Sequence, residues 1–161
     1  MDKKLEKAFN DQIKNELYSA YLYLSMAAYF DAKNLPGFSH WMKVQFKEET
    51  THAMKMFDFL ADRGARVALQ AIEEPTQDFD SVQDVFALTL GHEKKVTALI
   101  DKLYAIAKEI KDNASAVFLE WFISEQVEEE KNASSILETL KKLKPDCAAV
   151  IMLDRELAKR E

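Results

Sequence analysis

Two short segments of this chain combine residue types that bind metal ions. Residues 49–52 read Glu-Thr-Thr-His, and residues 126–129 read Gln-Val-Glu-Glu. In an α-helix, positions i and i+3 lie on one face, so the outer members of each segment can reach one centre. A further glutamate precedes each segment by 33 positions: Glu16 before Glu49, and Glu93 before Gln126. These spacings predict ligands arranged in two matching sets.

The two sets are themselves offset by a constant 77 positions, from Glu16 to Glu93 and from Glu49 to Gln126. The chain therefore reads as two copies of a helix pair. Each copy supplies one glutamate from its first helix and an i, i+3 pair from its second. We expect the copies to meet about a pseudo-twofold axis, with their ligands converging.

The charge of this set predicts which ions it holds. Burying unpaired carboxylates costs several kcal/mol each or forces protonation. Two divalent cations would offset the roughly four negative charges. Oxygen-rich ligation with one imidazole and no thiolate suits iron or manganese better than structural zinc. The residues concerned are four glutamates and two neutral ligands: Glu16, Glu49, Glu93, Glu129, His52 and Gln126.

The elements that must position these residues are long helices. Apolar residues recur at helical spacing, and each glutamate falls in the apolar stripe of its own segment. Ser39 and Ser81 are predicted N-caps, Gly64 a helix stop, and Pro145 the end of the fourth helix. The helices are expected at roughly 5–33, 39–63, 81–110, 114–143 and 148–158.

The link at about residues 65–80 is polar and too long for an ordinary loop in a compact domain. It is explained if it travels the length of a bundle, so that the third helix starts at the other end. We therefore predict an all-α protein with a single domain over residues 1–161. Its architecture is an antiparallel four-helix bundle with one long crossover and a short C-terminal fifth helix.

Composition excludes several other classes. Of 161 residues, 48% are hydrophobic and 31% charged, which argues against disorder, and 3 Gly with 3 Pro are too few for a turn-rich β fold. A net charge of −6 without a basic patch argues against nucleic-acid binding. No apolar stretch is long enough to span a membrane, and the first ten residues lack a secretory signal. The single cysteine, Cys147, excludes paired CxxC sites and is interpreted as inert. We expect a cytoplasmic protein.

The chain resembles the non-haem bacterial ferritins from its first helix through its fifth. Four segments carry the resemblance: Asn-Glu-Leu-Tyr-Ser-Ala at 15–20, Lys-Glu-Glu-Thr-Thr-His at 47–52, Gly-His-Glu at 91–93, and the acidic run at 121–130. Thr50 stands where a bacterioferritin would carry its haem methionine, and residues 126–129 do not form a second Glu-x-x-His. Both departures argue against haem.

The resemblance implies a role for each site residue. Glu16, Glu49 and His52 resemble the first iron site of a diiron ferroxidase centre, and Glu93 and Glu129 the second, with Glu49 bridging and Gln126 close by. Tyr23, Glu49 and Gln126 are expected to take a direct part in catalysis, Tyr23 as an electron donor or hydrogen-bond partner. A third iron site would use three additional acidic residues: Glu48, Glu125 and Glu128.

The implied function is iron storage. Fe(II) would be oxidised by dioxygen or hydrogen peroxide and deposited as ferric oxide inside a homo-oligomeric cage of twenty-four subunits. A second apolar stripe on the first helix predicts a dimer contact. It consists of Tyr18, Tyr21, Leu22, Met26 and Tyr29.

Several alternatives stay open at this point. The same ligands could serve a diiron oxygenase or peroxidase acting on an organic substrate, or the bundle could be metal-free and merely tolerate buried polar residues. Tyr23 could be ordinary core, and Glu48 and Glu125 could be surface residues. The metal held by the isolated protein could be iron, zinc or manganese.

Overall fold

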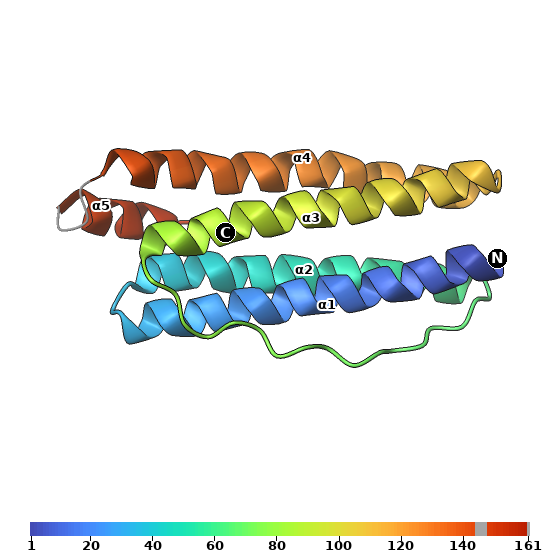
Figure 1. Cartoon of the computed structure of the whole chain (residues 1–161), viewed down its shortest axis with the longest axis horizontal. Helices are drawn as coiled ribbons and strands as arrows, with labels where there is room; N and C mark the ends of the chain where they lie inside the picture. The colour runs from blue at the N-terminus through green and yellow to red at the C-terminus, as the bar shows by residue number, and fades with distance from the viewer. Residues whose placement is uncertain (144–147, 161) are drawn as a thin grey trace.

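The computed structural model describes residues 1–143 and 148–160, and in this part of the chain all regular structure is helical (Figure 1). The predicted all-α bundle is confirmed. The predicted stop at Pro145 and the single cysteine, Cys147, lie outside the described residues. Five helices follow one another along the chain: α1 (Lys3–Ala32), α2 (Pro36–Asp62), α3 (Val82–Glu109), α4 (Asn113–Lys142) and α5 (Ala148–Leu157).

The four long helices form two neighbouring pairs, α1 with α2 and α3 with α4, and α5 packs against α2. Short turns join the members of each pair. The link between the pairs, residues 65–80, runs beside α1 from one end of the bundle to the other (Figure 1). The predicted long crossover is therefore present, and it lets α3 begin at the end of the bundle where α1 finishes.

Side chains of α1 hold the crossover in place. The Asn10 amide donates to the carbonyl oxygen of Arg66 at 3.0 Å, and its Oδ1 accepts from the Ala68 amide at 2.7 Å. Further along, the Ser25 hydroxyl donates to the carbonyl oxygen of Thr76 at 2.6 Å. These bonds satisfy backbone groups that have no helix or sheet partner.

One predicted helix start is wrong. The second helix begins at Pro36, after Leu35, three residues before the predicted start, and Leu35 makes no side-chain cap bond. Proline suits the first helical position because its fixed φ is helical and its missing N–H would have no partner there. Ser39 lies inside the helix and is buried. By contrast, Ser81 caps α3 as predicted, accepting from the Asp84 amide at 3.1 Å.

The buried apolar residues form two separate clusters along the bundle. One gathers around Phe30, Phe38 and Phe86, and the other around Phe9 and Phe122. Between them, each long helix contributes buried polar residues, so the core is divided by a polar layer. Its charged or amide members are Gln12 and Glu16 from α1, Gln45, Glu49 and His52 from α2, Glu93 from α3, and Gln126 and Glu129 from α4.

The predicted second stripe on α1 is only partly a free surface. Leu22 and Met26 are buried inside the chain, where they belong to the cluster around Phe86. Tyr21 remains exposed, and with Leu24, an exposed residue outside the predicted stripe, it lines a hollow between α1 and the crossover with a volume of about 690 Å³. None of the described helices is long and apolar enough to cross a membrane.

The fifth helix is attached to the start of α2 through Asp154. Its buried carboxylate accepts from the backbone amides of Gly37 and Phe38 at 2.8 and 3.0 Å. These amides are among the helix N–H groups without an intrahelical partner, so Asp154 caps α2 from another element. A Cβ added at Gly37 would overlap the backbone carbonyl of Asp154, so this close approach needs glycine.

Gly37→Ala should therefore displace α5 and destabilise the protein by about 1–3 kcal/mol, the usual cost of overpacking. Hydrogen exchange of the α5 amides should rise at the same time. The control is Gly91→Ala, where a Cβ meets nothing within 4 Å and the helix should gain stability. Unchanged exchange in α5 of the Gly37 variant would contradict this account of the packing.

Candidate metal centre

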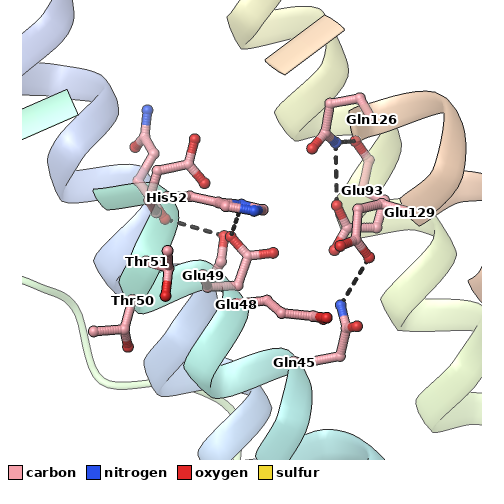
Figure 2. Close-up of polar contacts among 12 residues, drawn as sticks. Gln45, Glu48, Glu49, Thr50, Thr51, His52, Glu93, Gln126 and Glu129 are labelled. Carbon is pink, nitrogen blue, oxygen red and sulfur yellow. Dashed lines mark hydrogen bonds and ion pairs between the residues drawn. The ribbon is translucent and has the colours of Figure 1, made fainter. Parts of the chain in front are cut away.

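Three predicted ligands from α1 and α2 come together in the polar layer. One ligand atom from each of Glu16, Glu49 and His52 lies within 4.8 Å of the other two, and all three side chains are buried. His52 Nδ1 lies 3.5 Å from Glu49 Oε2 (Figure 2). Because Glu49 and His52 are one helical turn apart, both project from the same face of α2.

The carboxylates of this group have oxygens without partners. Both oxygens of Glu49 and Oε2 of Glu16 are buried and accept no hydrogen bond from the described residues. Burial raises the pKa of Glu49 well above its usual value, and the nearby carboxylates of Glu16 and Glu93 raise it further. Burial lowers the pKa of His52 to about 4, so its imidazole is neutral at pH 7. A neutral imidazole beside unpartnered carboxyl oxygens is a fitting donor set for a cation.

The second predicted group, from α3 and α4, lies across the bundle interior from Glu49 (Figure 2). Gln126 Nε2 donates to Glu93 Oε2 at 3.1 Å. The Tyr23 hydroxyl donates to the other Glu93 oxygen. On the remaining carboxylate, Glu129 Oε2 accepts from Gln45 Nε2 at 2.9 Å. These carboxylates are thus held by amides and a phenol before any ion arrives.

Burial also dominates the protonation of the second group. It raises the pKa of Glu93 to about 7 and that of Glu129 to about 8. The charge of Glu93 adds to the shift at Glu129. Tyr23 and the two glutamines oppose it by donating to the charged forms. Metal-free protein near neutral pH therefore holds protons where cations would bind.

Two residues that hold the ligands were missed by the sequence analysis. Gln12 Nε2 donates to Glu16 Oε1 at 2.8 Å, and Gln45 holds Glu129. A signal was present: Gln12 and Gln45 are also 33 positions apart, and each stands four residues before a ligand of its own helix. Both are therefore on the ligand-bearing faces of α1 and α2.

The residues predicted for a third site lie at the edge of the centre. Glu48 is half-buried and pairs with Arg160, at 2.5 Å between Oε2 and Nη2. The charges of Glu125 and Glu128 act on it and raise its pKa, although burial is the larger cause. Glu125 lines a groove of about 420 Å³ together with Glu48 and His52, while Glu128 is exposed. The three acidic residues are therefore neighbours, and Arg160 shares their space.

A four-helix bundle whose core is interrupted by a carboxylate-rich layer defines a ferritin-like protein, and the comparisons agree. A family model described as "Ferritin-like domain" matches residues 6–143. A bacterial non-heme ferritin of Staphylococcus aureus is 36% identical over 160 residues, which cover 99% of this chain and 96% of that protein. The chain belongs to the ferritin family.

Solved structures agree with this assignment. An open-pore ferritin of the hyperthermophilic archaeon Archaeoglobus fulgidus matches with a TM-score of 0.99 and 49% identity, over 100% of this chain and 98% of that one. A humanized archaeal ferritin matches with a TM-score of 0.99 and 47% identity, over 100% and 99% of the two chains. The resemblance expected from the sequence is confirmed.

The raised pKa values predict how the stability of the metal-free protein varies with pH. Unfolded glutamates release their protons near pH 4.5, whereas folded Glu93 and Glu129 hold theirs to about 7 and about 8. Between these limits the folded state binds more protons, so the free energy of unfolding falls as pH rises. We expect a loss on the order of a few kcal/mol between about pH 5 and pH 8.

The comparison is with the double variant Glu93→Gln and Glu129→Gln, measured by denaturant unfolding without metal. Its pH profile should be flatter than that of the unaltered protein over this interval. Parallel profiles would show that these two carboxyls titrate normally in the folded protein.

Proposed function

We propose that this chain stores iron, and that it oxidises Fe(II) at the centre formed by the polar layer. Membership of the ferritin family supports iron storage. The observation that carries the assignment to this site is the buried group of Glu16, Glu49 and His52, with three carboxyl oxygens lacking hydrogen-bond partners among the described residues. Ionising these carboxyl groups without a partner would be costly, and a bound cation removes the cost.

In this proposal, two Fe(II) ions are the substrates. Glu16, Glu49 and His52 hold the first ion, and Glu93 and Glu129 hold the second. Glu49 would bridge them, since carboxylates of both groups lie near enough to Glu49 to raise its pKa. Each ion gives up one electron to dioxygen or hydrogen peroxide. Divalent ions displace the protons that burial keeps on the glutamates, so metal binding releases protons.

The protein's contribution is to position the carboxylates and to limit access of water. Tyr23 and Gln126 hold the two oxygens of Glu93. Gln45 orients Glu129 from the facing helix pair. Such partners fix ligand orientation and tune ligand basicity. In this proposal Tyr23 serves as hydrogen-bond partner and as electron donor, and Gln126 acts beside the second ion.

The two ions have unequal environments, because an imidazole is available on one side only. We infer that oxidised iron leaves this unsymmetrical centre for storage and does not stay as a permanent cofactor. The third group, Glu48, Glu125 and Glu128, lies beside the groove that reaches His52 and provides a further binding position for iron.

Storage requires an enclosed volume, and we propose that the chain assembles into a homo-oligomeric cage of twenty-four subunits. The exposed Tyr21 and Leu24, with the hollow between α1 and the crossover, supply an apolar surface that a second copy can cover. A cytoplasmic location remains a prediction from the sequence.

Removing two ligands tests the site. The double variant Glu49→Ala and His52→Ala should lower the initial rate of Fe(II) oxidation by at least about 100-fold, since loss of mere outer partners already costs 10–100-fold. It should also lose the rise in melting temperature that Zn²⁺ gives the unaltered protein. Glu120→Ala, an exposed carboxylate of α4, is the control and should change neither value. Oxidation at the normal rate in the double variant would show that the reaction does not depend on this site and would contradict the proposal.

Aerobic loading tests storage. Metal-free protein receives a large excess of Fe(II), and iron and protein are then measured across a sizing column. We expect iron far above three atoms per chain, eluting with a particle of several hundred kilodaltons. Iron that stops at about two atoms per chain on a small oligomer would contradict storage and favour a diiron enzyme acting on an organic substrate.

A further inference from the structure

The residues that follow α5 reach the edge of the metal centre, up to Arg160. Beyond α5, Arg160 donates from Nη2 to Glu48 Oε2 at 2.5 Å. Its guanidinium carbon lies 4.5 Å from the centroid of the Trp41 ring. Its carbonyl oxygen accepts a hydrogen bond from His40 Nε2 at 2.7 Å. Three residues of α2 therefore hold the backbone and the side chain of Arg160.

The docking of α5 makes this position specific. Asp154 binds the start of α2, and the glycine at position 37 lets the two elements touch. Arg160 lies six residues beyond Asp154, past the last residue of α5, and contacts α2 at His40, Trp41 and Glu48. These contacts span about two turns of α2, so the side chain of Arg160 reaches Glu48 at the edge of the centre. Only 19% of that side chain is exposed, and its Nη1 is buried without a partner among the described residues.

The surroundings of Arg160 are those expected for a metal cation. Its partner Glu48 is adjacent in sequence to Glu49, and both Glu125 and Arg160 line the groove that reaches His52. The charge of Arg160 acts also on Glu129, a proposed ligand, where it favours the ionised form. The guanidinium thus neutralises part of the acidic cluster and, unlike the two lysines of the same groove, pairs directly with Glu48.

We propose that Arg160 is a built-in counter-ion that competes with metal for Glu48. When α5 is docked, the guanidinium of Arg160 pairs with the carboxylate of Glu48. A divalent ion that binds to Glu48 and Glu125 must displace this guanidinium. The proposal rests on the proposed function, because Glu48 binds iron only beside a working centre.

Because both need the Glu48 carboxylate, metal binding at Glu48 and pairing of Arg160 with Glu48 oppose each other, and the two equilibria are therefore linked. Metal at Glu48 weakens the attachment of the chain end, and attachment of the chain end weakens metal binding, by the same factor. Metal binding at the third iron site thus loosens residues 154–160. While α5 is docked, Glu48 is available to a cation only when Arg160 briefly releases it. Arg160 acts through Glu48 and is a positioning residue, not a ligand.

The first test is a calorimetric titration of the metal-free, assembled protein with Zn²⁺, which binds without being oxidised. We expect two tight ions per chain and a weaker third. In Arg160→Gln the third ion should bind about tenfold more tightly, with the first two unchanged. Lys159→Gln is the matched control, because Lys159 carries the same charge one residue away but pairs with the exposed Glu156.

The outcomes separate this proposal from the function on which it rests. An unchanged third affinity in Arg160→Gln, with the two tight ions present, overturns the role of Arg160 alone. Absence of the two tight ions in the unaltered protein contradicts the proposed centre itself. An equal gain in Lys159→Gln would reduce the effect to general surface charge and would also overturn the proposal.

A second measurement does not depend on altering Arg160. Hydrogen exchange of residues 154–160 should increase when the third equivalent of Zn²⁺ is added to the unaltered protein. In Glu48→Gln it should be high before metal is added and should not respond to it. Exchange that stays constant through all three equivalents in the unaltered protein would overturn the coupling.

Discussion

The burial of four glutamates between two apolar clusters is the constraint on which the rest of this structure depends. The clusters around Phe30 and Phe9 close off the two ends of the layer and keep bulk water away from it. Each carboxylate must then find a proton, a hydrogen-bond donor or a cation. The raised pKa values of Glu93 and Glu129 indicate that these carboxyl groups keep protons. Tyr23 and the buried amides supply hydrogen-bond donors. A cation is the third possible partner, and it is the one on which the proposed iron chemistry depends.

The two helix pairs meet this constraint differently. On the side of Glu49, three of the four carboxyl oxygens of Glu16 and Glu49 stay without partners among the described residues, whereas both oxygens of Glu93 accept hydrogen bonds. The first side gains more from an incoming cation, since nothing has to be displaced except a proton. The second side is held in place beforehand and loses less freedom on binding. The two sides therefore differ both in their ligands and in how firmly hydrogen bonds hold those ligands before a metal binds.

Helix phase, spacing and family resemblance were sufficient to predict the bundle, its crossover and the charged or amide residues of the polar layer except Gln12 and Gln45. What failed depended on tertiary contacts. Ser39 has the chemistry of a cap, but Pro36 starts the helix earlier and Asp154, 117 residues beyond Gly37, supplies the cap. Met26 was predicted to lie in a dimer contact, but it is buried within the chain because α1 packs against more than one neighbouring helix. Arg160 could not be placed, because its position depends on how α5 docks.

The constant offset between the halves has a consequence for symmetry. Two separate copies of one helical hairpin, paired about a twofold axis, would be obliged to present identical ligands to their shared centre. Joining them through the crossover at residues 65–80 removes that obligation, because each half is then encoded independently. His52 and Glu129, at equivalent places 77 positions apart, are the visible result. Joining the halves in one chain is what allows them to carry different ligands around one centre.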